Sequence, residues 1–179
     1  HDRQSGATER VNVASSGAEA NNGSWYASIS ADGRYVAFSS FASNLVPGDT
    51  NFATDVFVHD RQSGTTERVS VDSAGMQADG GSGYYSPPSI SSADGRYVAF
   101  ASAANNLVLS DTNGIVDVFV RDLQTGVTLL ASVGARAINP YIPVGSDSPD
   151  LSADGRYVAF YTTATNLVPG VTNSGEIFI

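Results

Sequence analysis

Two short runs of the chain carry carboxylate and amide side chains at the same spacing. Residues 49–55 read DTNFATD and residues 111–117 read DTNGIVD, so each run has Asp, Asn and Asp at relative positions 1, 3 and 7. Hard cations such as Ca²⁺ bind about six to eight oxygen atoms, and closely spaced carboxylates and carbonyls supply several of them. The sequence therefore predicts these calcium ligands: Asp49, Asn51, Asp55, Asp111, Asn113 and Asp117.

The calcium interpretation has a structural alternative. An Asp in such a run can instead cap a turn, and Asn tolerates left-handed backbone geometry. A third copy of the run has Val171 at the first position, keeps Asn173 and has Glu176 one position early. We therefore expect the third loop to hold no cation, and turn capping stays open for the other two.

The remaining titratable residues recur in a way that does not suit catalysis. An Asp followed by Gly returns in each copy of the phrase ADGRY, at Asp32, Asp94 and Asp154. A catalytic group is needed once, so these residues are expected to cap turns. The two histidines, His1 and His59, share one repeat position, which Arg121 occupies in the third copy, and we expect them on strand surfaces.

No motif for a nucleophile, a metalloprotease or a phosphate-binding loop is present in the sequence. Cysteine is missing, which excludes disulfides and thiolate chemistry. The sequence therefore predicts that the chain is not an enzyme.

Aromatic residues precede the first predicted strand of each copy. On an exposed rim they would stack against a sugar or a peptide, whereas the structural alternative is that they plug loops against a neighbouring sheet. The predicted ligand-binding residues are Trp25, Tyr26, Tyr84, Tyr85 and Tyr141.

These residues are positioned by an internal repeat. The phrase SADGRYVAF returns with a spacing of 62 and then 60 residues, measured between the Asp residues of the phrase. A unit of this size cannot bury its faces alone and must stack against its neighbours. We treat residues 1–179 as one segment with repeat units of approximately 1–58, 59–120 and 121–179.

The second unit shows the pattern of strands most clearly. Residues 55–59, 66–71, 89–91 and 96–102 read as strands, and an Ala-Asp-Gly turn precedes the last of them. The run 96–102 is apolar on both faces, which is typical of a strand covered on both sides. Four strands per unit without a helical period predict an all-β chain of four-stranded antiparallel blades, a β-propeller. A linear solenoid is the competing geometry.

The phrases in residues 28–40, 55–71, 89–102, 117–133 and 151–160 resemble the WD40-like (PD40), TolB-type β-propeller repeat. The resemblance implies a propeller with an extracellular or periplasmic location. Such repeats also occur in propellers attached to enzymes, so the resemblance does not define an activity.

Three blades make an incomplete ring, because propellers have about four to eight. Residues 8–13 are expected to form a fourth strand without a blade of its own, while the last blade, from residue 151 to 179, lacks that strand. Either the chain is a piece of a longer propeller, or copies associate head to tail. Two copies would give six blades, and a rotation that does not close would give a filament.

Composition limits the partners. The net charge is −9, with 18 acidic residues against 9 basic residues that are all Arg, which disfavours nucleic acid. No apolar run approaches the roughly 20 residues of a membrane-spanning helix, so we expect no membrane insertion.

The function predicted from these observations is a non-catalytic scaffold or interaction module, stabilised by calcium. A protein partner would bind on the rim formed by loops 14–27, 72–88 and 134–149. The alternatives are a self-assembling unit, built by strand donation from residues 8–13, and an accessory propeller of a larger hydrolase.

Overall fold

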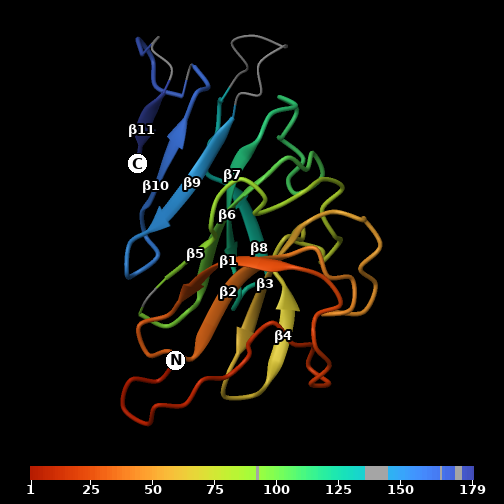
Figure 1. Cartoon of the computed structure of the whole chain (residues 1–179). Helices are drawn as coiled ribbons and strands as arrows, with labels where there is room; N and C mark the ends of the chain where they lie inside the picture. Colours follow the sequence, from red (N-terminus) through yellow and green to blue (C-terminus); the bar gives the residue numbers. More distant parts are fainter. Residues whose placement is uncertain (92, 136–144, 166, 172–174) are drawn as a thin grey trace.

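The chain folds into three antiparallel β-sheets (Figure 1). The structure is a computed structural model and describes residues 1–91, 93–135, 145–165, 167–171 and 175–179. In these residues every regular element is a strand. None of the described residues belongs to a helix long and apolar enough to cross a membrane.

Each sheet is a meander, in which strands that follow one another in sequence are neighbours in space. The first sheet contains β1 (Ser24–Ile29), β2 (Tyr35–Ser40), β3 (Asp55–Asp60) and β4 (Thr65–Arg68). The second contains β5 (Ser89–Ile90), β6 (Tyr97–Ser102), β7 (Asp117–Asp122) and β8 (Val127–Leu130). The third contains β9 (Ser146–Leu151), β10 (Val158–Thr162) and β11 (Glu176–Phe178). We call these sheets blades 1, 2 and 3. The predicted boundaries between repeat units, after residues 58 and 120, fall inside β3 and β7, so each of the first two blades contains residues of two units.

Two predicted strands differ from the structure. The run 66–71 leaves the ladder after Arg68, because the N–H groups of Val69 and Ser70 both donate to the carbonyl of Val56, at 2.7 and 3.4 Å. Residues 8–13, all of which the structure describes, form no strand, and within this segment only Val13 makes an isolated bridge, to Glu19. The prediction of a strand at 8–13 is therefore wrong. The segment has nearly the same sequence as 66–71, but no strand of the described chain pairs with it.

The core lies between blades 1 and 2, and β2, β3, β6 and β7 are buried on both faces. One cluster joins side chains of both blades, including Val56, Val58, Val98 and Phe100. The opposite face of blade 1 carries a second cluster around Phe38 and other residues of the first blade. Burial on both faces confirms what the apolar run 96–102 predicted and identifies the sheets as stacked blades.

The repeated phrase ADGRY is explained by a contact between successive blades. Gly95 has φ +66°, and a Cβ built there would lie 2.3 Å from Cδ2 of Tyr35 in the preceding blade. Gly155 has φ +68° and would bring its Cβ to 2.1 Å from Cδ2 of Tyr97. The glycine thus permits the turn and also leaves room for the tyrosine ring.

The arginine of the same phrase fixes that ring. In blade 2, the guanidinium carbon of Arg96 lies 4.8 Å from the centre of the Tyr97 ring, and Nη2 lies 2.6 Å from Oδ2 of Asp122. Blade 1 has the same arrangement, made by Arg34, Tyr35 and Asp60.

The long loops that the structure describes within the first two blades share one end, because neighbouring strands are antiparallel. The loops before the first strand, between the second and third strands and after the fourth strand lie at this end, which we call the loop end. Its described parts include residues 14–23, 41–54, 69–88 and 103–116. The ADG turns and the turns between the third and fourth strands lie at the opposite end.

Candidate functional site

The first Asp/Asn loop is built around an arginine. Nη1 of Arg68, on β4, lies 3.3 Å from Oδ1 of Asp49 and 3.5 Å from Oδ2 of Asp55. The same nitrogen donates to Oε1 of Gln77 at 2.9 Å, and Nη2 donates to the carbonyl of Gly48 at 3.4 Å. The guanidinium therefore occupies the space between the two predicted calcium ligands.

The other polar groups of this loop hold one another. Nδ2 of Asn51 donates to Oδ2 of Asp55 at 3.1 Å and to the carbonyl of Ala78 at 3.0 Å, while its Oδ1 accepts from the N–H of Ala53. Oγ of Ser70 donates to Oδ1 of Asp55. Burial raises the pKa of the Asp55 carboxyl, and the Ser70 hydroxyl and the Arg68 charge oppose that shift.

The second loop repeats this geometry without the arginine. Oγ of Ser132 donates to Oδ1 of Asp117, and Nδ2 of Asn113 donates to the carbonyl of Ala135 at 3.1 Å. Asp117 is fully buried and Asp111 is 5% exposed. Within the described residues neither oxygen of Asp111 has a hydrogen-bond partner, nor does Oδ2 of Asp117.

The electrostatics of the second loop follow from this lack of partners. Burial raises the pKa of Asp117 to about 6; the Ser132 hydroxyl and the Asn113 amide oppose the shift, and the neighbouring Asp111 charge adds to it. The Asn113 amide is nevertheless outside hydrogen-bonding geometry for Oδ2 of Asp117. Burial also raises the pKa of Asp111. The N–H of Asn113 opposes that shift, although it is outside hydrogen-bonding geometry for either Asp111 oxygen. An unpaired buried carboxylate is strongly destabilising, so this loop favours a proton or a cation.

The third loop differs from both. Val171 replaces the first carboxylate, and Asn173 lies outside the described residues. Glu176 pairs with Thr162 in the ladder, the position that corresponds to Asp55 in β3 and Asp117 in β7. In the described part of the chain no group of three or more His, Cys, Asp or Glu side chains is arranged around a metal position. A cation at the first or second loop would therefore be held by two carboxylates together with neutral oxygens.

The Asp residues of the ADG phrase cap their turns. Oδ1 of Asp32 accepts from the N–H of Arg34 at 2.9 Å and from Oγ of Ser30 at 2.6 Å. Asp154 makes the same two bonds in blade 3, and these bonds lower the pKa of both carboxyls. The expected role as turn caps agrees with this geometry.

His59 lies inside the blade, so its expected place on a strand surface is wrong. It is 6% exposed, and Nδ1 lies 2.9 Å from Oγ1 of Thr66 on the neighbouring strand. Burial lowers the pKa of the imidazole. In blade 2, Arg121 makes the corresponding contact with Oγ1 of Thr128 at 3.0 Å, which indicates a structural position.

Three of the predicted aromatic residues are exposed. Tyr26, Tyr84 and Tyr85 are 43%, 56% and 62% exposed, and the rings of Tyr84 and Tyr85 meet edge to face at 5.1 Å. Trp25 is half-buried, and Tyr141 lies outside the described residues. Tyr26 has φ +55° at a bulge in β1, a left-handed conformation that is strained for a bulky side chain.

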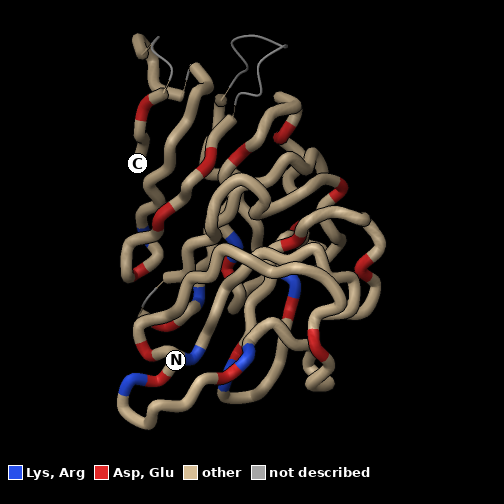
Figure 2. The backbone as a smooth tube through the Cα atoms, in the orientation of Figure 1, with Lys and Arg blue, Asp and Glu red and all other residues tan. Residues whose placement is uncertain are grey.

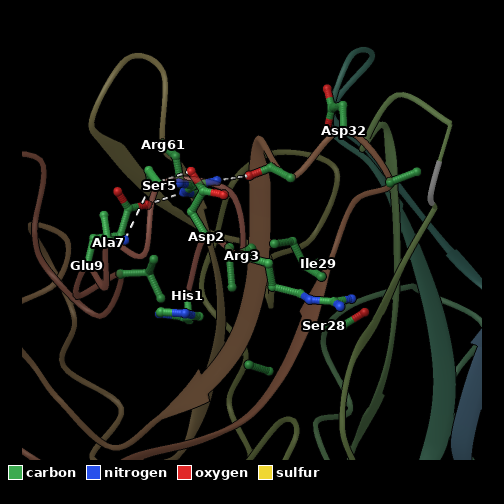
Figure 3. Close-up of a pocket in the computed structure, with 15 residues that line it drawn as sticks. His1, Asp2, Arg3, Ser5, Ala7, Glu9, Ser28, Ile29, Asp32 and Arg61 are labelled. Atoms are coloured by element: carbon green, nitrogen blue, oxygen red, sulfur yellow. Dashed lines mark hydrogen bonds and ion pairs between the residues drawn. The ribbon is translucent and has the colours of Figure 1, made fainter.

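A groove of about 810 Å³ separates the N-terminal residues from blade 1 (Figure 3). Asp2, Glu9 and Arg61 line it, and Arg61 forms an ion pair with Glu9 and donates to the carbonyl of Gly33. Nδ1 of His1 is within hydrogen-bonding distance of Oγ1 of Thr8, at 3.0 Å. A smaller groove of about 440 Å³ lies between blades 1 and 2 and also has both charges in its lining. Each groove therefore lies between blade 1 and one of its neighbours, the N-terminal residues on one face and blade 2 on the other.

Acidic residues lie along the whole tube in Figure 2, whereas the described arginines lie in its lower half. Among the residues that the structure describes, five arginines form ion pairs with Asp or Glu: Arg10, Arg34, Arg61, Arg68 and Arg96.

Comparison with known proteins identifies the fold. No protein-family model matches the chain, and no curated protein matches it. Among solved structures, TolB from Acinetobacter baumannii superposes with a TM-score of 0.50 and 18% identity, covering 87% of this chain and 29% of that one. A putative TolB from Agrobacterium tumefaciens gives 0.47 and 18%, covering 77% and 38%. The β-propeller domain of the Trilobed protease from Pyrococcus furiosus gives 0.48 and 14%, covering 88% and 42%.

The chain spans less than a third of the Acinetobacter TolB structure. At such identities the likeness concerns the fold alone. Together with the stacked meander sheets, it shows that residues 1–179 form blades of a TolB-like β-propeller that do not complete a ring.

Proposed function

We propose that the chain is a non-catalytic β-propeller module that binds a protein partner at its loop end. The observation that carries the proposal is the pair Tyr84 and Tyr85, both more than half exposed and held edge to face. Aromatic side chains of this kind supply large contact area and are enriched where binding energy concentrates.

Tyr26 supports the same assignment. Its backbone holds a left-handed conformation at the β1 bulge, and its side chain is 43% exposed. The equivalent residue of blade 3, Ser148, has φ +52° at the same bulge, so this conformation belongs to the repeated blade. The support from Tyr26 is therefore its exposed ring beside the loop end.

The absence of catalysis is part of the proposal. The Asp, Arg and Ser residues of the ADGRY turns recur at equivalent positions of the blades and are hydrogen-bonded within their own blade, as Asp32 and Asp154 are. His59 is buried against Thr66 and is replaced by Arg121 in the next blade. The extracellular or periplasmic location that we propose is supported by the resemblance of the repeat to TolB-type propellers.

The test is site-specific photo-crosslinking in cells of the source organism. A crosslinking amino acid at position 85 should give a discrete adduct with one protein. The same amino acid in place of Gln62, which is exposed at the opposite end, should not. Equal adducts from both positions, or none from position 85, would contradict the proposal, as would a hydrolytic activity that a single substitution removes.

A second candidate is self-association by strand addition. In the described residues blade 3 has three strands, and the outer edge of β11 has no partner. Residues 8–13 read TERVNV, close to the TERVSV that contributes β4, and belong to no strand of the described chain. Light-scattering mass in solution tests it, because a monomer at all protein concentrations would exclude it. A role as an accessory domain of a hydrolase stays a prediction.

A further inference from the structure

The two Asp/Asn loops differ at one position of the outer strand. Arg68 lies opposite Phe57 in the β3–β4 ladder, and Leu130 lies opposite Phe119 in the β7–β8 ladder. The other polar positions are kept, since Ser70 and Ser132 make the same bonds to Asp55 and Asp117. The arginine that neutralises blade 1 is therefore replaced by a hydrocarbon side chain in blade 2.

The replacement leaves buried charge without a partner. Blade 2 keeps both carboxylates, of Asp111 and Asp117, and three of their four oxygens have no hydrogen bond to any residue that the structure describes. In native structures nearly all buried polar atoms have a partner, and a buried atom that lacks one points to an ordered water or a bound ion. Removing one member of a buried ion pair is strongly destabilising because the other charge remains uncompensated.

Blade 1 shows where the missing charge would lie. One nitrogen, Nη1 of Arg68, is within 3.5 Å of both Asp49 and Asp55, so a single positive centre can serve both carboxylates. Its Nη2 also reaches the carbonyl of Gly48, whose equivalent in blade 2 is Ser110. The Gln77 amide of blade 1 has no counterpart, because Gly134 takes its place.

We propose that Asp111 and Asp117 bind one Ca²⁺ ion at the position equivalent to Nη1 of Arg68, while the first loop binds none. The candidate ligands are carboxylate and carbonyl oxygens, which suit a hard cation, and an incomplete protein set completed by water is compatible with calcium's flexible coordination. The protein contains no cysteine and no histidine occurs in this loop, so zinc is disfavoured. The inference is independent of the proposed function.

The wild-type protein provides the first test. After removal of metal with a chelator, native mass spectrometry and calorimetric titration with CaCl₂ should give one bound ion per chain. At a free calcium concentration of about 100 times Kd, the ratio of folded to unfolded protein should rise about 100-fold. A folded, metal-free protein that binds no calcium at millimolar concentration would overturn the proposal and assign a proton to this pair instead.

Two reciprocal substitutions locate the ion. Leu130→Arg should abolish calcium binding and make the protein as stable in chelator as the wild type is in calcium. Arg68→Leu should raise the stoichiometry from one ion to two, because it empties the equivalent space in blade 1. Calcium binding that survives Leu130→Arg in a folded protein would overturn the assignment.

Matched carboxylate variants separate binding from folding. Asp111→Asn should lose calcium binding, whereas Asp49→Asn, at the equivalent place in blade 1, should keep one ion. Circular dichroism verifies the fold of each variant. Loss of binding in Asp49→Asn but not in Asp111→Asn, or preferential binding of Zn²⁺ by the wild type, would refute the site.

Discussion

Replacing Gly95 by alanine tests whether successive blades are held by the tyrosine–glycine contact. An alanine at φ +66° costs about 1–2 kcal/mol in backbone strain. Its Cβ would also lie 2.3 Å from Cδ2 of Tyr35, so the ring must move, and overpacking of this kind costs a further 1–3 kcal/mol or so. The free energy of unfolding should therefore fall by about 2–5 kcal/mol.

Gly33 is the matched control. It occupies the same ADG turn in blade 1 with φ +71°, but a Cβ built there would meet only Nη1 of Arg61, at an ordinary 3.4 Å. Gly33→Ala should therefore cost the backbone strain alone, about 1–2 kcal/mol. The difference between the two variants measures the contact between the blades.

Urea unfolding followed by circular dichroism gives both free energies, and unchanged m-values show that the transitions are comparable. In a Tyr35→Ala background, Gly95→Ala should cost no more than Gly33→Ala, because the clash has been removed. Equal costs for Gly95→Ala and Gly33→Ala in the wild-type background would refute the reasoning.

Two further predictions concern charge and burial. The hydrogen bonds from Arg96 hold the pKa of Asp122 well below its ordinary value, so the ionised carboxylate stabilises the fold above about pH 4, and this stability is lost as the pH falls further. Asp122→Asn should cost about 1–2 kcal/mol at neutral pH and progressively less below about pH 4 in thermal unfolding; a cost independent of pH would contradict the pairing. Phe119→Ala should cost about 3–5 kcal/mol because the ring is fully buried between blades, whereas Phe178→Ala, at the equivalent place in the three-stranded blade, should cost clearly less. Equal losses in urea unfolding would show that blade 3 is as well covered as blade 2.

The blades are predictable from sequence because their signals are local and repeated. The turn Asp, its Gly and the apolar run after them lie within about ten residues, so one phrase predicts a turn and a buried strand. The tyrosine of the phrase is different. Tyr35 contacts Gly95 in the next blade, and its role becomes visible only when the blades are stacked.

The sequence predicts the candidate site only in part for the same reason. Asp49 and Asp55 are close in sequence, but Arg68 reaches them from the neighbouring strand. When the repeats are aligned, Leu130 corresponds to Arg68. This loss of a positive charge is the signal that the sequence contains. The expectation for His59 is wrong because its burial depends on Thr66 and the next layer, which strand periodicity alone does not report.

The tyrosine–glycine contact is left half-made on both outer blades. The Gly33 turn of blade 1 receives no tyrosine among the described residues, and Tyr157 of blade 3 is 48% exposed. Ile29, on the same outer face of blade 1, is 56% exposed, although its equivalent Ile90 is 4% exposed between the blades. A heterologous contact between two such faces would form a ring where the rotation closes and a filament where it does not. The contact that joins blades within this chain would therefore also join a further blade to the stack, whether that blade belongs to a longer chain or to a second copy.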